Sequence, residues 1–151
     1  MTKRDIKKIR FHYLNQSFYL PNRTLLKTFI LSLFEKEGFE VQEVNYIFCS
    51  DEYLLELNRT YLNHDTLTDI ITFQYSEAFQ PILSDVYISI ERVRENAVFY
   101  KNSFIQELYR VLFHGALHLC NYGDKTKKET VLMRRKEDSY LKAYVPRGTQ
   151  A

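Results

Sequence analysis

Residues 111–124 read VLFHGALHLCNYGD, and this stretch decides the expected fold and the expected chemistry. His114 and His118 are four residues apart in an apolar run, so on a helix both imidazoles leave on the same side, one turn apart. From Ser103 onward, apolar residues cover most of the circumference of this helix, which is typical of a buried central helix. Buried imidazoles need partners for their nitrogens, and a metal ion is one such partner.

The chain after the histidines supplies a candidate for a third metal ligand. Because Gly123 suits the left-handed conformation that ends a helix, we expect the helix to stop near Asn121. Asp124 lies six residues after His118, on chain that folds back over the histidine face. His114, His118 and Asp124 therefore form a predicted open, three-ligand site for one zinc ion or another divalent metal ion. The alternative is that ordinary hydrogen bonds in the core satisfy both histidines.

Composition predicts a soluble globular protein. The chain has 151 residues, of which 45% are hydrophobic and 26% charged, and this length fits one domain, 1–151, with 146–151 as a frayed tail. No stretch approaches the roughly 18 consecutive apolar residues of a membrane span, and no apolar signal region follows the basic N-terminus. Cys49 and Cys120 have no metal-binding or redox spacing, which indicates reduced thiols in a cytoplasmic protein. The oligomeric state stays open.

Basic residues cluster beside the predicted metal site. The net charge is only +2, but Lys125, Lys127 and Lys128 directly follow Asp124. Such a cluster favours a polyanionic substrate, so these lysines are candidate substrate-binding residues. The alternative is a solvated surface in which acidic residues are interspersed, namely Glu129, Glu137 and Asp138.

Hydrophobic periodicity predicts an α+β fold. Alternating or β-branched runs indicate four strands, at 6–14, 40–48, 70–75 and 83–90. Helical spacing and capping residues indicate helices at 22–38, 51–62, 90–100, 103–121 and 126–144, the last one ended by Pro146. This order predicts a mixed sheet of four or slightly more strands covered by helices, with a zincin-like central helix that carries HxxxH.

Three short motifs resemble the YbeY family, metal-dependent hydrolases implicated as endoribonucleases in rRNA maturation. Residues 114–119, HGALHL, match the family's H-G-x-L-H-L run. Residues 57–58 and 68–73 are similar to its L-N and T-D-V-L-S-F signature, and 84–86 to its Gly-Asp-Ile. The resemblance spans the second strand to the final helix. It implies a zinc-dependent, single-strand-specific endoribonuclease that acts in 16S rRNA 3′-end maturation, with RNA and the small ribosomal subunit as partners.

The chain departs from the family pattern at positions that bear on the chemistry. The family has a third zinc-ligand histidine where this chain has Asp124, and the charge of a carboxylate ligand lowers the Lewis acidity of the ion. The family also has an arginine, implicated in substrate contact or catalysis, where this chain has Leu62. Arg59, one helical turn earlier, is the candidate to replace it.

The expected reaction is hydrolysis by a metal-activated water, and its general base is undecided. HExxH peptidases carry a Glu after the first ligand, whereas this chain has Gly115, which argues against peptidase chemistry. Glu107, on the polar sector of the central helix, is one candidate base. The resemblance adds Asp69 and Asp85 as candidates and Thr68 as a substrate contact; turn and strand-end structure is the alternative role for these three.

Two other functions remain open at this point. A ribosome-associated assembly factor that binds RNA around a structural metal would tolerate the altered ligand and the missing arginine. A metal-dependent hydrolase of a non-RNA substrate would use the same site residues. Binding that weakens steeply with ionic strength would point to RNA.

Overall fold

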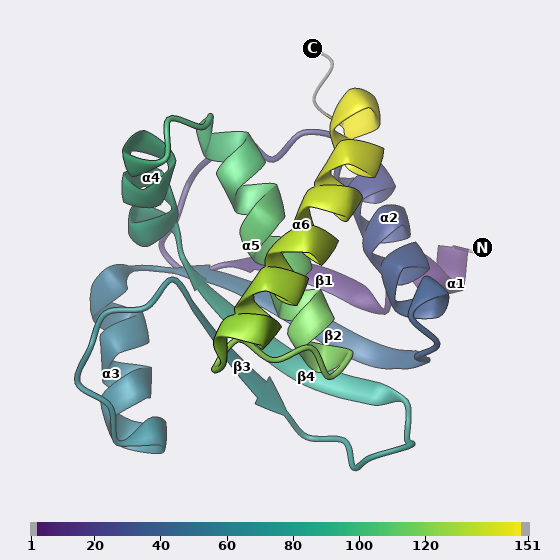
Figure 1. Cartoon of the computed structure of the whole chain (residues 1–151), viewed down its shortest axis with the longest axis horizontal. Coiled ribbons are helices and arrows are strands. Elements are labelled where there is room, and N and C mark those ends of the chain that lie inside the picture. The colour runs from purple at the N-terminus through teal and green to yellow at the C-terminus, as the bar shows by residue number, and fades with distance from the viewer. Residues whose placement is uncertain (1–2, 149–151) are drawn as a thin grey trace.

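The computed structural model describes residues 3–148, and within them four strands form one mixed sheet (Figure 1). Their order across the sheet is β1, β2, β4, β3, with bounds Ile9–Tyr13, Val41–Cys49, Ile82–Ser89 and Ile70–Gln74. β2 pairs in parallel with both β1 and β4, whereas β3 runs antiparallel to β4. The predicted α+β fold with a four-stranded mixed sheet is confirmed.

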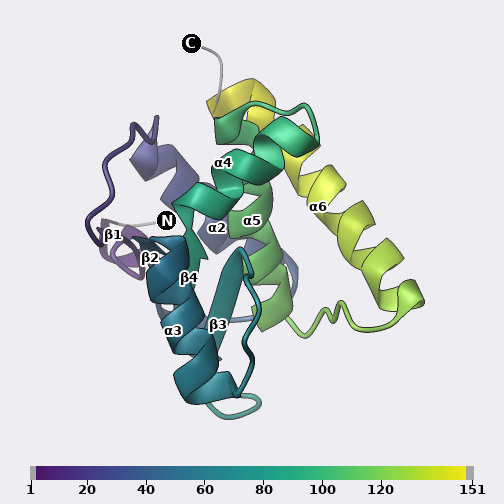
Figure 2. The same cartoon turned by 90° about the vertical axis from the view of Figure 1, so that its left-hand side faces the viewer.

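Helices cover both faces of the sheet (Figure 2). On one face lie three helices that pack together, α2 (Arg23–Lys36), α5 (Phe104–Leu119) and α6 (Lys127–Gly148). On the other face lies α3 (Asp51–Leu62), while α4 (Ile90–Phe99) leads from β4 to α5 and the short α1 (Lys3–Ile6) precedes β1. Among the described residues, no helix is long and apolar enough to cross a bilayer.

Aromatic side chains hold the three helices of the first face together. The ring centroid of Phe29 in α2 lies 5.2 Å from that of Phe113 in α5 and 4.7 Å from that of Tyr144 in α6. All three rings are buried. Aromatic pairs of this kind contribute about 0.5–1.5 kcal/mol each beyond the area that they bury. The packing of α5 against α2 and α6 is therefore set by these side chains.

The central helix lies close to the sheet because Gly115 has no side chain. A Cβ atom at this position would lie 2.9 Å from Ile70 Cδ1 and 3.2 Å from Val86 Cγ1. Ser103 fixes the start of the helix, since its side chain accepts a hydrogen bond from the Gln106 N–H. The close packing at Gly115 therefore places the preceding residue, His114, near strands β3 and β4.

The structure corrects the predicted end of the central helix. α5 stops at Leu119, and Asn121, with φ 71°, takes the left-handed conformation that was expected of Gly123. Gly123 lies against the carboxylate of Glu129, which would have to move aside for a Cβ atom at this position.

The structure bears on two other predicted helix ends. Asn22 is the N-cap residue of α2, as predicted, but it has a left-handed conformation, with φ 51°, and its side chain makes no capping hydrogen bond. The predicted end of the last helix was wrong, because α6 continues through Pro146 to Gly148. Of the predicted frayed tail, residues 149–151 lie outside the described residues.

We expect Gly115→Val to lower the free energy of unfolding by about 1–3 kcal/mol, because the added atoms have to displace Ile70 and Val86. Urea denaturation followed by circular dichroism measures the change. Ala143→Val is the matched control, since it places the same β-branched residue at an exposed position of α6. A loss for Gly115→Val that is no larger than the loss for Ala143→Val would contradict the packing explanation, because helix propensity alone favours valine over glycine.

Candidate active-site cleft

A cleft of about 410 Å³ opens beside α5 at the level of His114. Four parts of the chain supply its polar lining: the loop before β3, the C-terminal half of α4 with the residue that follows it, α5, and the region from Asp124 into α6. The polar residues of the lining are Thr68, Asp69, Asn96, Tyr100, Glu107, Arg110, His114, Asp124, Thr130, Arg134 and Glu137. Three larger hollows among the described residues, of about 780, 850 and 440 Å³, contain no histidine. The chemistry of the lining, and not the volume, therefore singles out this cleft.

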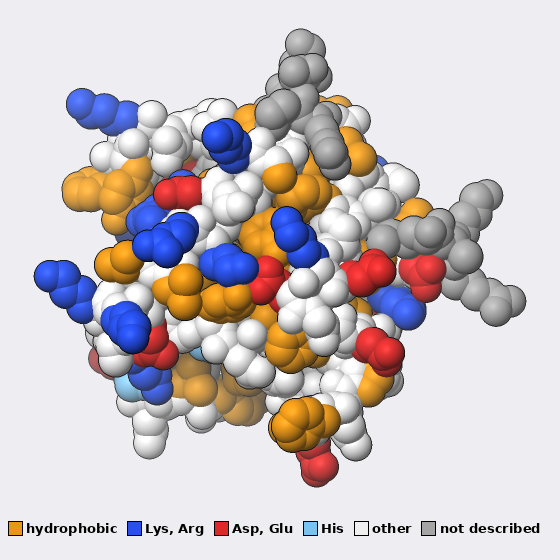
Figure 3. Space-filling model, turned by 45° about the vertical axis from the view of Figure 1, so that its right-hand side comes forward, with side chains coloured by type: hydrophobic (Ala, Val, Ile, Leu, Met, Phe, Trp, Pro, Cys, Tyr) orange, Lys and Arg blue, Asp and Glu red, His pale blue; other side chains and the backbone are white. Residues whose placement is uncertain are grey.

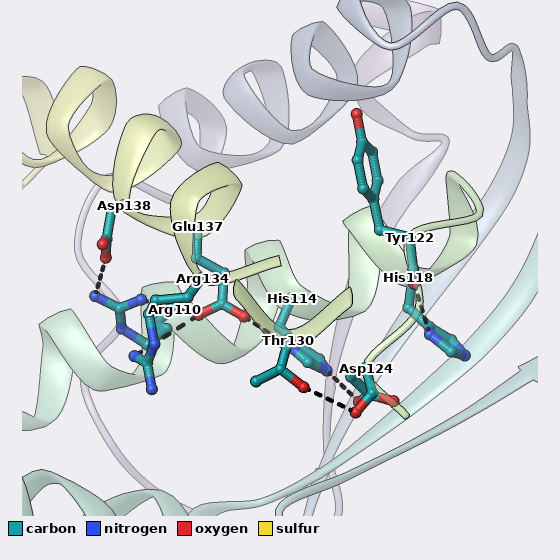
Figure 4. A network of polar contacts seen from close by, with 9 residues as sticks. All are labelled: Arg110, His114, His118, Tyr122, Asp124, Thr130, Arg134, Glu137 and Asp138. Carbon is teal, nitrogen blue, oxygen red and sulfur yellow. Dashed lines mark hydrogen bonds and ion pairs between the residues drawn. The ribbon is translucent and has the colours of Figure 1, made fainter. Parts of the chain in front are cut away.

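His114 is held by a buried carboxylate of α6 (Figure 4). Its Nδ1 lies 2.7 Å from Oε2 of Glu137. The other carboxylate oxygen of Glu137 accepts a hydrogen bond of 2.8 Å from Arg110, which also donates to Asp138 at 2.7 Å. The imidazole of His114 is thus oriented from α6, while its backbone belongs to α5.

The pKa shifts follow from this arrangement. Burial alone would raise the pKa of Glu137, but the hydrogen bonds from His114 and Arg110 outweigh it, and the pKa is lowered. Burial alone would lower the pKa of His114, but the hydrogen bond and the charge of Glu137 raise it. Because an ionised carboxylate only accepts hydrogen bonds, Nδ1 of His114 carries the proton in this contact and Nε2 is the nitrogen left for another partner.

Asp124 is that partner, as the spacing in the sequence suggested. Oδ2 of Asp124 lies 3.4 Å from Nε2 of His114. Two ligands of a tetrahedral zinc ion with bonds of about 2.0–2.1 Å are separated by about 3.3–3.4 Å, so this pair fits two positions of such a site. Thr130 of α6 steadies the loop, since its hydroxyl donates to the backbone carbonyl of Asp124 at 3.2 Å.

His118 lies one turn further along α5 and is exposed. Its Nδ1 is 3.2 Å from the carbonyl oxygen of Tyr122, which can only accept, so Nδ1 is the donor in this contact. The hydroxyl of Tyr122 in turn donates to Glu37 at the end of α2, at 2.6 Å. Within residues 3–148, however, no three His, Cys, Asp or Glu side chains are already grouped to hold a metal ion. The structure brings His114 and Asp124 together and leaves His118 beside them.

Two of the three candidate proton-transfer groups line the cleft. Burial raises the pKa of Asp69, with the charge of His114 acting in the opposite direction. Glu107 is buried on α5 and accepts a hydrogen bond of 3.3 Å from Asn102. Thr68 also lines the cleft, and its hydroxyl donates to the carbonyl of Ile70 at 3.3 Å.

The other candidates lie on the opposite face of the sheet. Successive side chains of β4 alternate, so Asp85 points away from the face on which Val86 packs under α5. Its carboxylate accepts hydrogen bonds from Tyr75, at 3.1 Å, and from Asn45, at 3.2 Å. Arg59, on α3, pairs with the exposed carboxylates of Glu56 and Asp65. Neither Asp85 nor Arg59 lines the cleft, so this placement does not support the roles expected of them.

The three predicted substrate-binding lysines are exposed near the start of α6 but do not line the cleft, namely Lys125, Lys127 and Lys128. Figure 3 shows Lys and Arg side chains across one half of the face that carries α6, with hydrophobic side chains between them. Sequence reasoning missed Glu137, Arg134 and Tyr100 as site residues. For Glu137 a signal existed, because it shares a helical stripe with the buried Met133 and Tyr140.

Comparison with known proteins identifies the family. A family model described as Endoribonuclease YbeY matches residues 12–145. Curated proteins named endoribonuclease YbeY are 49% identical to this chain in Flavobacterium psychrophilum, covering 90% of this chain and 96% of the relative, and 49% identical in Cytophaga hutchinsonii, covering 82% and 87%. The solution structure of TM1509 from Thermotoga maritima superposes with a TM-score of 0.62 at 30% identity, covering 91% of this chain and 89% of that one. The chain belongs to the YbeY family.

Proposed function

We propose that this protein is a zinc-dependent endoribonuclease that cuts single-stranded RNA in the cleft beside α5 and acts in the maturation of the 3′ end of 16S rRNA. Family membership supports the ribonuclease reaction, since the relatives carry the name endoribonuclease. The observation that carries the metal assignment is the pair of Nε2 of His114 and Oδ2 of Asp124, 3.4 Å apart, with the imidazole held from behind by Glu137. Carboxylate–histidine pairs of this kind orient zinc ligands in many metalloenzymes.

Three side chains would hold the ion: His114, Asp124 and, after a local adjustment, His118. Zinc bound there would supply a water of lowered pKa and a Lewis acid for the phosphoryl oxygen. The chain itself supplies orientation, because the Nδ1 contacts of both histidines leave the two Nε2 atoms available. Glu137, with both oxygens engaged, keeps His114 in that tautomer.

Asp69 is the proposed proton-transfer residue. It lines the cleft with His114, and burial raises its pKa, so its carboxyl group holds a proton to a higher pH than an ordinary aspartic acid. A protonated carboxyl group at this position would donate to the leaving oxygen when the phosphodiester breaks. The rate that depends on this proton falls as the pH rises through the pKa of Asp69.

Zinc titration tests the metal assignment. We expect wild-type protein to bind about one equivalent of zinc and Glu137→Gln to bind it about 10- to 100-fold more weakly, because the amide is a poorer partner for the His114 imidazole. Asp138→Asn is the matched control, since Asp138 also pairs with Arg110 but does not touch His114. His114→Ala and Asp124→Ala should lose most of the affinity. A Glu137→Gln protein that binds zinc as Asp138→Asn does would contradict the role of Glu137.

Cleavage of a fluorophore-labelled single-stranded RNA tests the reaction. We expect Asp69→Asn to reduce the rate about 10²- to 10⁴-fold and to flatten the decline of the rate at higher pH, with zinc binding retained. Asp85→Asn makes the same chemical change on the opposite face of the sheet and should leave the rate on this short RNA near that of wild type. RNA that binds with a steep salt dependence but is never cut would instead favour the non-catalytic assembly factor.

A further inference from the structure

The walls of the cleft carry two side chains that the proposed reaction does not yet use. α5 lies between α4 and α6, so the cleft is bordered by α4 on one side and by α6 on the other (Figures 1 and 2). Tyr100 closes the C-terminal end of α4, and Arg134 lies on α6, one turn before Glu137. His114 and Asp124 line the same cleft.

Arg134 keeps its hydrogen-bond donors available, in contrast to Arg110. Arg110 donates to Glu137 and Asp138 at 2.8 and 2.7 Å, and the second oxygen of Glu137 is engaged by His114 at 2.7 Å. Nη1 of Arg134 is 3.9 Å from Glu137, which is beyond hydrogen-bonding distance, and its side chain is 55% exposed (Figure 4). A guanidinium in this state can turn its planar donor pair to a phosphate group.

The charge of the lining gives such a cation a role. Besides Asp69, which is the proposed proton donor, the described residues of the cleft include three carboxyl groups and two arginines: Glu107, Asp124 and Glu137 with Arg110 and Arg134. Positive charge in addition to that of a bound zinc ion would lower the repulsion between an entering phosphodiester and the carboxylates of the lining. Arg110 is already paired with two carboxylates. Of the two arginines in this lining, Arg134 is therefore the one that can bind an added anion.

Tyr100 offers the complementary apolar contact. Its side chain is 55% exposed although it lines the cleft. Phe99 meets it edge to face, with ring centroids 5.0 Å apart and planes at 88°. An exposed aromatic ring in the same cleft as an available cation is the combination that single-strand nucleic-acid sites use to stack bases.

We propose that Arg134 binds the phosphodiester of the RNA substrate in the cleft and that Tyr100 stacks on a base next to it. The inference rests on the proposed endoribonuclease function and names the residues that position its substrate.

Arg134 is tested by RNA binding as a function of salt. We expect Arg134→Met to reduce the slope of log K against log salt by about 0.7 and to slow cleavage, whereas Arg134→Lys, which keeps the charge but not the planar donor pair, restores the slope more fully than the rate. Arg135→Met is the matched control, an identical change at the next residue of α6, which is exposed and does not line the cleft. Equal effects of Arg134→Met and Arg135→Met would overturn the assignment. Thermal unfolding of each variant verifies that it is folded.

Tyr100 is tested with RNA in which one base at a time is removed. Tyr100→Ala should weaken binding between about 5-fold and about 100-fold, Tyr100→Phe should bind as wild type does, and Phe99→Ala, which changes the more exposed neighbour, should have a smaller effect. At one position of the RNA, base removal should abolish the difference between wild type and Tyr100→Ala. A loss that is the same for every abasic RNA would contradict stacking.

The two levels of the hypothesis fail in different ways. Wild-type protein that neither binds nor cuts single-stranded RNA would overturn the proposed function and this inference together. Wild-type protein that cuts RNA while Arg134→Met and Tyr100→Ala match their controls would overturn the positioning roles alone.

Discussion

The buried carboxylate of Glu137 is the interaction on which the arrangement of the cleft depends. Removing a carboxylate from water costs several kcal/mol unless every oxygen finds a partner. Here one oxygen accepts from Arg110 and the other from His114, both on α5, while Glu137 itself belongs to α6. One charge therefore joins the two helices and orients the imidazole that faces Asp124. The packing of α6 and the chemistry of the site cannot be changed independently.

A second polar network anchors the turn that follows α5. Glu37, at the end of α2, accepts hydrogen bonds from Tyr122 and from Tyr140 and pairs with Lys136 at 3.2 Å. The carbonyl of Tyr122 then receives the Nδ1–H of His118. Each histidine is thus oriented by a different neighbouring element, α6 for His114 and the turn after α5 for His118. The site is built from helix packing and not from the sheet alone.

Much of this fold was predictable, and the reason is the strength of its periodic signals. The apolar circumference of 104–119 identified the central helix, and the spacing of His114 and Asp124 anticipated their contact. The face of the sheet was not predictable in the same way. Alternation shows that Asp85 and Val86 point in opposite directions, but only the three-dimensional packing shows that α5 lies on the side of Val86. Glu137 escaped prediction because charged residues surround it in the sequence.

The most direct test of the account is a crystal structure grown with zinc, with anomalous scattering recorded at the zinc edge. The account predicts one strong peak in the cleft, within about 2.0–2.2 Å of Nε2 of His114, Nε2 of His118 and the Asp124 carboxylate, with Nδ1 of His114 still on Glu137. A peak that lies elsewhere, or no peak in the cleft at saturating zinc, would contradict it.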